Sequence, residues 1–251
     1  MLAEERFALI LDLLAEKRTA TVQELCEALN ASESTIRRDL TELDRQGRLN
    51  KVHGGATLPN GQFLADEPTM AAKESLAVSQ KQSIAEAAAA LINAEDFVYV
   101  DAGTSTLAMV RALNGPALEA HYVTNGIAHA RMLVQKGCRT YLPGGQVRPI
   151  TEAITGPETL ADLQHYNFTK AFMGANGVSP AEGFTTPDPE EASIKTAALQ
   201  RARERWFLVD NTKFDMVYSA VIGDIGCGAI LTNHCPDPRY AQLTFVKECS
   251  V

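Results

Sequence analysis

The sequence lacks long apolar runs and an export signal, and both absences exclude classes of protein. Its longest uninterrupted apolar stretch is Ala87–Ile92, far below the roughly 20 residues that a membrane-spanning helix needs. The first residues include Glu4 and Glu5, whereas an export signal begins with a basic segment. We therefore expect a cytoplasmic protein that has no membrane partner.

Metal and disulfide chemistry are also disfavoured. The 5 cysteines are scattered, and no two of them form a Cys-x-x-Cys pair. Cys227, His234 and Cys235 lie close in the sequence, but their spacing is irregular for a metal site, and buried thiols explain them better. The sequence predicts reduced thiols, no metal and no cofactor.

The distribution of charge is more informative than the net charge of −8. Residues 1–57 carry 8 Lys or Arg against 10 Asp or Glu, and residues 58–251 carry 15 against 21. Residues 34–53, however, contain five basic side chains and only three acidic ones. A short basic strip on an acidic protein predicts a focused contact with nucleic-acid phosphates.

Composition and periodicity predict two folded domains joined by a linker. Residues 58–69 contain two prolines and an Asn-Gly pair, which favour a linker over a helix. Residues 1–57 have helical periodicity. In residues 70–251, strand and helix patterns alternate, which predicts an α/β domain with an open, mainly parallel sheet.

The first domain has the pattern of a winged helix-turn-helix. One helix is predicted over Glu4–Lys17, and a second begins at Thr21, with a glutamate in the capping-box position three residues on. A third helix follows the N-cap residue Ser32 and ends at Gly47. The basic, alternating segment 48–55 then predicts a strand and a glycine turn, which together form the wing.

The exposed side of the third helix and the wing are predicted to contact DNA. Short polar side chains allow a close approach to base edges in the major groove, and arginines bind phosphate or guanine. An ordinary solvated helix face is the alternative, because Arg-Arg pairs are common. The predicted DNA-binding residues are Ser34, Thr35, Arg37, Arg38, Arg45, Arg48, Lys51 and His53.

Loops that follow predicted strands of the second domain favour a phosphorylated ligand. The strand Phe97–Val100 leads into a small hydroxylated loop, residues 101–106, before a helix, and backbone N–H groups at such a helix start can bind phosphate. Other strands also end in small polar loops, which converge on one crevice in a parallel sheet. An ordinary capping turn at 101–106, a capping role for Asp210 and a surface position for Lys213 are the alternatives.

Two motifs of the first domain, ASESTIRRDL at residues 31–40 and VHGGA at residues 52–56, resemble the signature of the DeoR family of bacterial transcriptional regulators. The resemblance implies a repressor of a sugar-catabolic operon that binds double-stranded operator DNA. A homo-oligomer, either a dimer or a tetramer, is expected because two half-sites need two reading heads.

The second domain is similar to the DeoR sensor domain, which shares its fold with ribose-5-phosphate isomerase and the CoA-transferase superfamily. The similarity implies a site for a small phosphorylated sugar. Its implied residues are Asp101, Gly103, Thr104, Ser105, Thr106, Thr124, Asn125, Gly144, Gly145, Glu191, Lys195, Asp210 and Lys213. The spacing of Glu191 and Lys195 also suits a helix surface pair worth about 0.3 kcal/mol.

Turnover of the sugar is not expected. The isomerases carry an acidic Asp-Gly-Ala-Asp-Glu loop where this chain has GANGV at residues 174–178, and neither glycine nor asparagine moves a proton as a carboxylate does. The resemblance therefore implies binding without catalytic residues. A sugar-phosphate isomerase with an appended DNA-binding head is the alternative.

The segment Gly183–Ala192 and the turn Ala31–Thr35 look like those of the fructose-operon repressors within the family. That resemblance implies fructose 1-phosphate as the effector that modulates operator binding. The Thr-Pro-Asp-Pro sequence in this segment also suits a rigid loop, and other sugar phosphates stay open.

Overall fold

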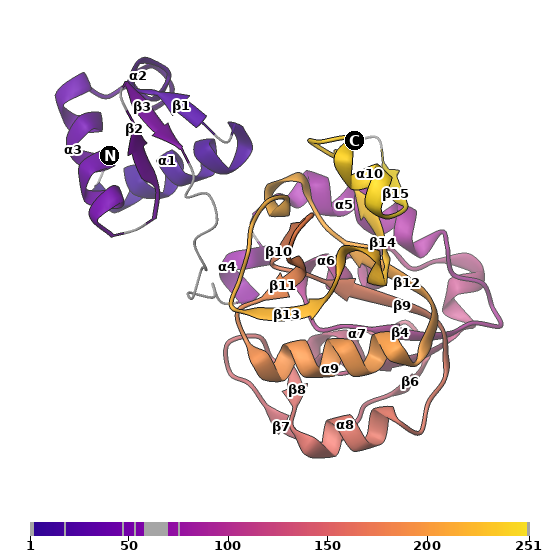
Figure 1. Cartoon of the computed structure of the whole chain (residues 1–251). Coiled ribbons are helices and arrows are strands. Elements are labelled where there is room, and N and C mark those ends of the chain that lie inside the picture. The colour runs from indigo at the N-terminus through magenta and orange to yellow at the C-terminus, as the bar shows by residue number, and fades with distance from the viewer. Residues whose placement is uncertain are drawn as a thin grey trace. The chain divides into compact units, whose positions relative to one another are not determined.

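The protein is described here by a computed structural model that covers residues 3–17, 19–46, 48–52, 54–57, 70–74 and 76–249. The chain divides into two compact units, residues 1–62 and 63–251 (Figure 1). The predicted linker, residues 58–69, and the predicted helix end at Gly47 lie outside the described residues. The predicted domain boundaries at 57 and 70 therefore stay predictions.

The described part of the first unit contains three helices and a three-stranded antiparallel sheet. The helices are α1 (Ala3–Lys17), α2 (Val22–Leu29) and α3 (Glu33–Arg45). The strands are β1 (Thr19–Thr21), β2 (Asn50–Val52) and β3 (Gly55–Thr57), in the order β1-β3-β2. The predicted winged helix-turn-helix is confirmed.

Short-range hydrogen bonds explain where α2 and α3 begin. The N–H of Glu24 donates to Thr21 Oγ1 at 3.2 Å, and the N–H of Thr21 donates to Glu24 Oε2 at 2.8 Å. This reciprocal pair is the predicted capping box. Ser32 Oγ accepts the N–H of Thr35 at the start of α3, so the predicted N-cap is also confirmed.

One acidic residue of the basic strip belongs to the core of this unit. Asp39 is 4% exposed, and its carboxylate accepts hydrogen bonds from Arg6 Nε at 2.7 Å and Arg6 Nη2 at 3.2 Å. This two-pronged contact ties α3 to α1 and restricts how α3 can rotate. Because Asp39 is turned inward, the outer side of α3 is more positive than the sequence count indicates.

A seven-stranded parallel sheet forms the centre of the second unit. In chain order its strands are β4 (Phe97–Val100), β5 (His121–Thr124), β6 (Arg139–Tyr141), β9 (Phe168–Gly174), β12 (Ala202–Leu208), β14 (Ala229–Thr232) and β15 (Val246–Glu248). They lie in the order β15-β14-β12-β9-β4-β5-β6, and every neighbouring pair is parallel. The predicted α/β fold with a parallel sheet is confirmed.

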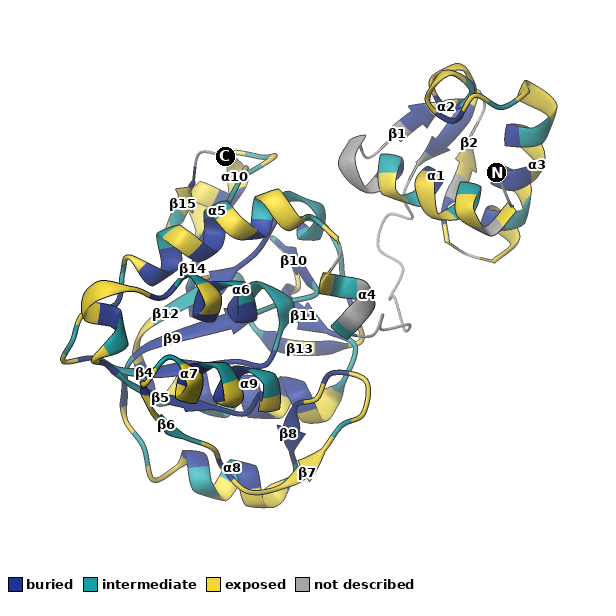
Figure 2. Cartoon of the chain, turned by 180° about the vertical axis from the view of Figure 1, so that it is seen from behind, coloured by how far each residue is buried: buried dark blue, intermediate teal, exposed yellow. Residues whose placement is uncertain are grey.

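Alternating side chains explain why helices cover both faces of this sheet. Val98 and Val100 of β4 belong to a buried cluster with residues of α5 (Val78–Ala89), α6 (Thr104–Ala112) and α7 (Ile127–Gln135). Tyr99, between them, belongs to a second cluster with α8 (Pro157–Leu163) and α9 (Pro189–Gln200). Figure 2 shows the buried strands between helices whose outer sides are exposed.

Several small elements were not predicted from the sequence. An antiparallel sheet contains β10 (Gly177–Ser179), β11 (Gly183–Thr186) and β13 (Ala220–Gly223), and β7 (Gln146–Val147) pairs with β8 (Ile154–Thr155). The short helices are α4 (Met70–Glu74), α10 (Arg239–Leu243), η1 (Gly115–Leu118), η2 (Asn211–Lys213) and η3 (Ile225–Cys227). Short strands that are buried throughout, such as β10 and β11, have no alternating pattern to detect.

The strand order reverses beside β4. The chain runs outward from β4 to β6, returns to β9 on the other side of β4 and then continues to β15. Ligands of open parallel sheets bind at the carboxyl ends of the strands where such a reversal occurs. The loops after β4 and β9 meet there, because the N–H of Gly174 donates to Asp101 Oδ2 at 2.9 Å.

At the amino ends of the same two strands, a buried ion pair joins Lys170 to Asp96. The Nζ–Oδ2 distance is 2.6 Å, and the two residues are 7% and 8% exposed. Burial raises the pKa of Asp96, but hydrogen bonds from the N–H of Asn93, from Lys170 and from Thr169 together lower it below its ordinary value. The charged form of Asp96 is therefore the form that stabilises the fold.

We predict that Lys170→Met lowers the free energy of unfolding at pH 7 by about 3 kcal/mol, because it leaves a buried carboxylate without its charged partner. Since the pKa of Asp96 is lowered by folding, the contribution of its charge is complete above about pH 4 and is lost as the pH falls through the folded-state pKa. Urea unfolding should show a smaller loss at pH 3 than at pH 7. An equal loss at both pH values, or an equal loss for the exposed-lysine control Lys247→Met, would contradict this assignment.

Candidate functional sites

The third helix of the first unit has one buried side and one exposed side. Ile36, Leu40 and Leu43 are fully buried. Thr35 is half-buried, and its Oγ1 lies 2.9 Å from Ser32 Oγ within the N-cap. The exposed side chains of α3 include Ser34, Arg37, Arg38, Thr41 and Arg45.

Two of these arginines form ion pairs on the helix surface. Arg37 donates to Glu33 Oε1 from Nη2 at 2.6 Å and from Nε at 2.9 Å. Arg45 donates to Glu42 from Nη2 at 2.6 Å and from Nε at 3.0 Å. Solvent-exposed ion pairs contribute little to stability, so neither carboxylate holds its arginine strongly.

The wing is held against α3 by a lysine. The N–H of Lys51 donates to Asp44 Oδ1 at 2.8 Å, and Lys51 Nζ donates to Thr41 Oγ1 at 2.7 Å. Arg48, between α3 and β2, is exposed. The structure therefore brings Lys51 of the wing beside the exposed side of α3, whereas His53 lies outside the described residues.

In the second unit, a buried ion pair lies at the carboxyl end of β4. Asp101 Oδ2 accepts hydrogen bonds from Lys195 Nζ of α9 and from the N–H of Gly174. Asp101 is 1% exposed and Lys195 is 4% exposed. Burial raises the pKa of Asp101; Lys195 and the N–H of Gly174 oppose that shift, and Glu191 adds to it.

A second ion pair, whose carboxylate is buried, lies one helical turn earlier on α9. Glu191 Oε1 accepts from Arg148 Nη1 at 2.6 Å and from Thr151 Oγ1 at 2.5 Å, and Arg148 Nη2 also lies 3.1 Å from Asp188 Oδ2. The alternative of a surface pair between Glu191 and Lys195 is wrong, because both side chains are buried and each has another partner.

The loop between β4 and α6 presents backbone groups and hydroxyls at a helix start. Gly103 precedes α6 and supplies no side-chain cap, and the first N–H groups of any helix lack intrahelical acceptors. Thr104 and Ser105 are half-buried at this start. Thr106 Oγ1, in contrast, is buried and donates to Asp101 O at 2.6 Å, so its hydroxyl shapes the loop.

Asn125, at the carboxyl end of β5, also supports this loop. Its Oδ1 accepts from Tyr99 Oη and from the N–H of Ala102, both at 3.0 Å, and its Nδ2 donates to Ile154 O at 3.2 Å. The neighbouring Thr124 accepts the N–H of residue 126 at 3.1 Å. The hydrogen bonds of both side chains therefore stabilise the loops that follow β4 and β5.

Gly144 and Gly145 pack against α8 and β8. The N–H of Gly144 donates to Asp162 Oδ2 at 2.9 Å, and its carbonyl accepts from Thr159 Oγ1 at 2.7 Å. Gly145 has a φ of +145°, and a Cβ there would lie 2.3 Å from Thr159 Oγ1 and 2.5 Å from Thr155 O. Only glycine fits this close approach, and the predicted position of both residues beside a ligand stays a prediction.

The sequence analysis missed Lys81, a buried lysine on α5. Lys81 is 7% exposed, and its Nζ donates to Lys73 O at 2.5 Å. Burial lowers its pKa to about 8. The charge of Asp210 raises this pKa, and the charge of Lys213 lowers it. A lysine three positions before Ile84, within the apolar stripe of a helix, was the signal that could have indicated it.

Asp210 is buried and caps the 3-10 helix η2. Its Oδ1 accepts from the N–H of Thr212 at 3.0 Å and from Thr212 Oγ1 at 2.5 Å. The capping alternative for Asp210 is therefore confirmed. The charge of Asp210 also raises the pKa of Lys81, so this capping residue still acts on the buried lysine.

His129 on α7 is the second buried polar residue that the sequence analysis missed. It is 1% exposed, and its Nε2 lies 3.0 Å from both Thr106 Oγ1 and Gly103 O. It therefore lies directly against the loop between β4 and α6. A single histidine within an amphipathic helix gives no sequence signal for such a contact.

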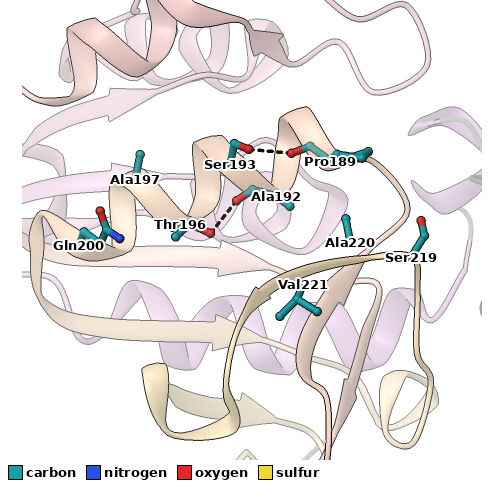
Figure 3. A pocket seen from close by; sticks show the side chains of 9 residues that line it. All are labelled: Pro189, Ala192, Ser193, Thr196, Ala197, Gln200, Ser219, Ala220 and Val221. Carbon is teal, nitrogen blue, oxygen red and sulfur yellow. Dashed lines mark hydrogen bonds between the residues drawn. The ribbon is translucent and has the colours of Figure 1, made fainter.

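A shallow groove of about 530 Å³ lies on the outer side of α9, beside β13 (Figure 3). Ser193 Oγ donates to Pro189 O at 2.9 Å, and Thr196 Oγ1 donates to Ala192 O at 2.8 Å. The groove is lined by Pro189, Ala192, Ser193, Thr196, Ala197, Gln200, Ser219, Ala220 and Val221. Because these residues carry no charge and two of the hydroxyls donate to the helix, the groove does not suit a phosphate.

Two kinds of feature are absent from the described residues. No helix among them is long and apolar enough to span a membrane. Within the same residues, no group of three or more His, Cys, Asp or Glu side chains is arranged to hold a metal ion.

Comparison with known proteins identifies the family. Residues 6–62 match the DeoR-like helix-turn-helix domain, and residues 76–232 match the DeoR C terminal sensor domain. The chain belongs to the DeoR family. It is 40% identical over 250 residues, 98% of this chain and 98% of the relative, to the uncharacterized HTH-type transcriptional regulator FruR of Bacillus subtilis strain 168.

A second DeoR-family relative is the lactose phosphotransferase system repressor of Streptococcus mutans. It is 35% identical over 85% of this chain and 84% of its own length. Ribose 5-phosphate isomerase A from Methanocaldococcus jannaschii aligns over 53% of each chain at 16% identity with a TM-score of 0.40, too low to support an inference. The family membership expected from residues 31–40 and 52–56 is confirmed, and the chain is a transcriptional regulator.

We predict that Tyr99→Phe lowers the free energy of unfolding by about 1 kcal/mol, because it removes one of the hydrogen bonds that Asn125 Oδ1 accepts in the core. Urea unfolding monitored by circular dichroism measures the change. Tyr141→Phe, a half-buried tyrosine in the same unit, is the matched control and should change stability less. If the two variants lose equal stability, the contact between Tyr99 and Asn125 is not what supports the loop.

Proposed function

We propose that this chain represses a sugar-catabolic operon by binding operator DNA, and that a phosphorylated sugar modulates this binding. The DNA-binding residues would be those predicted on α3 and the wing, whose exposed basic side chains support the assignment. The names of the two relatives, a transcriptional regulator and a sugar phosphotransferase repressor, agree with it. The observation that carries the effector part is the cluster of buried charged side chains at the carboxyl end of β4.

The charges around Lys81 favour an anion. Asp101 and Lys195 cancel each other's charge, whereas Arg148 lies against two carboxylates, those of Glu191 and Asp188. The charges that act on Lys81 are those of Asp210, Lys213, Lys73 and Glu74, so three lysines stand there against two carboxylates. The positive charge around Lys81 and the open N–H groups at the start of α6 suit a phosphate, and the buried carboxylates suit sugar hydroxyls.

The proposed ligand residues are those implied by the sequence, with Lys81 added. We expect Gly103, Thr104 and Ser105 to contact the phosphate. Thr106 and Asn125 would act through the loop that they support. Fructose 1-phosphate is the proposed effector, on the resemblance of residues 183–192 to the fructose-operon repressors.

We propose that the site binds its sugar without turning it over. A proton shuttle needs a carboxylate that is free to take and return a proton, and Asp101 is held by Lys195. In the loop after β9, Asn176 Oδ1 accepts from Thr186 Oγ1 at 3.1 Å. An amide in this position binds but does not exchange a proton, which disfavours the isomerase alternative.

Contacts of α4 offer a route from this site toward the predicted linker. Lys81 Nζ donates to the carbonyl of Lys73 in the last turn of α4. At the start of α4, the N–H of Met70 donates at 3.1 Å to Ile150 O, in the loop that carries Arg148. A phosphate that draws Lys81 away from Lys73 would loosen α4, so ligand binding and the path of the chain near the linker are coupled.

We predict that Arg38→Ala weakens operator binding by about 1–3 kcal/mol if Arg38 contacts a base, and weakens binding to all DNA alike if it contacts phosphate. The measurement is fluorescence anisotropy at fixed salt with two duplexes, one from the region upstream of this chain's own gene and one of scrambled sequence. Arg203→Ala, an exposed arginine of the second unit, is the control. Unchanged binding in both Arg37→Ala and Arg38→Ala would remove the assignment of α3.

We predict that Lys213→Met leaves unliganded operator binding unchanged but abolishes its response to fructose 1-phosphate, a response worth about 1–3 kcal/mol in the parent. Lys81→Met should lose the response as well. In addition, it should shift unliganded operator affinity toward the liganded value of the parent, because it also removes the contact with α4.

The same anisotropy titration, with and without fructose 1-phosphate, tests both variants against Lys247→Met, which should behave as the parent does. A parental response in Lys213→Met would place the ligand elsewhere. Equal unliganded operator affinities for Lys81→Met and Lys213→Met would contradict the coupling through α4.

A further inference from the structure

His129 lies under the loop that is proposed to hold the phosphate. Its ring comes from α7 and is almost fully buried. Its Nε2 lies 3.0 Å from Thr106 Oγ1, 3.0 Å from Gly103 O and 3.4 Å from Gly103 N. One ring nitrogen therefore contacts a hydroxyl, a carbonyl and an N–H of the same loop, and its protonation decides which of them it binds.

The surroundings of the ring place the proton on Nε2. Nδ1 is buried and has no hydrogen-bond partner, and it faces the backbone of Gly126, where an added Cβ would lie 2.3 Å away. A buried N–H without an acceptor is rare and costly, so Nδ1 is the unprotonated nitrogen. Thr106 Oγ1 lies within hydrogen-bond distance of two carbonyls, Asp101 O at 2.6 Å and Gly103 O at 2.9 Å. Its proton goes to the closer one, Asp101 O, which leaves its oxygen to accept from Nε2–H.

This tautomer has a consequence for Gly103. A protonated Nε2 donates to Thr106 Oγ1 and Gly103 O and cannot accept the N–H of Gly103. That N–H is then available to a ligand, together with the open N–H groups in the first turn of α6. The opposite tautomer would bind the N–H of Gly103 and remove it from the site.

We infer that His129 is a positioning residue for the phosphate of the effector, which holds Gly103 and Thr106 so that the N–H of Gly103 is presented to the anion. The inference rests on the proposed function and concerns the phosphate part of the ligand. The pKa of His129 is lowered to about 4, chiefly by burial and also by the positive charges of Lys195 and Arg111, against a hydrogen bond with Gly103 that raises it. The ring is thus neutral across the physiological range, and its contribution is geometric.

Two amide substitutions separate this role from a merely structural one. The amide nitrogen of glutamine reaches the position of the histidine Nε2, whereas that of asparagine reaches only the position of Nδ1. His129→Gln therefore keeps a donor for Thr106, and His129→Asn does not. Both variants leave a polar side chain of smaller volume in the same cavity.

The experiment is calorimetric titration of the full chain with fructose 1-phosphate and with inorganic phosphate, alongside a melting curve for each variant. His129→Asn should weaken binding of both probes about tenfold, the loss of roughly one hydrogen bond to an anion, and His129→Gln should restore it. Parental affinity in His129→Asn, or equal losses in the two variants at parental melting temperature, would overturn the inference. Failure of the parent to bind either probe would instead overturn the proposed function.

A second measurement uses the parent chain alone and does not depend on how the variants fold. The ¹⁵N shifts of the His129 ring should show a protonated Nε2, an unprotonated Nδ1 and no titration between about pH 5 and 8. Adding fructose 1-phosphate should shift the amide signal of Gly103 without changing the tautomer. A protonated Nδ1 would overturn the inference whatever the variants do.

Discussion

The buried ion pair between Asp101 and Lys195 is the contact on which the second unit depends. Asp101 ends β4, and Lys195 comes from α9, the helix that covers one face of the sheet. Neither charge is stable in the core without the other, so the pair determines where α9 lies. It thereby places Glu191, one turn earlier, beside Arg148. The pair therefore anchors the buried polar residues that lie at the strand-order reversal.

The first unit uses the same device on a smaller scale. Arg6 of α1 holds Asp39 of α3 by two hydrogen bonds, and these act from the buried side of the helix that exposes Arg37 and Arg38. In both units, a charge that is withdrawn from solvent orients the element that carries the functional side chains. The remaining charges are left for the proposed partners, DNA phosphate at α3 and a sugar phosphate near the buried Lys81.

The residues around the proposed phosphate site divide by the direction of their hydrogen bonds. Thr106, Asn125 and His129 direct theirs into the loop and the neighbouring strands. Gly103 and Thr104 are left at the start of α6. A ligand motif in a sequence therefore contains two kinds of residue, those that contact the ligand and those that hold the contacting groups in place. Hydrogen-bond geometry separates the two kinds, whereas residue type does not.

The sequence alone determined the helices of the first unit, the caps at Thr21 and Ser32, the main parallel strands and the loops in which the polar residues lie. These features depend on neighbours a few positions apart, through periodicity and local hydrogen bonds. Only the tertiary structure decided the partners of the buried charges and the inward turn of Asp39. The Asp101–Lys195 contact spans 94 residues, and the Arg6–Asp39 contact spans 33. A charged residue type requires a partner when it is buried, but packing alone selects which residue that partner is.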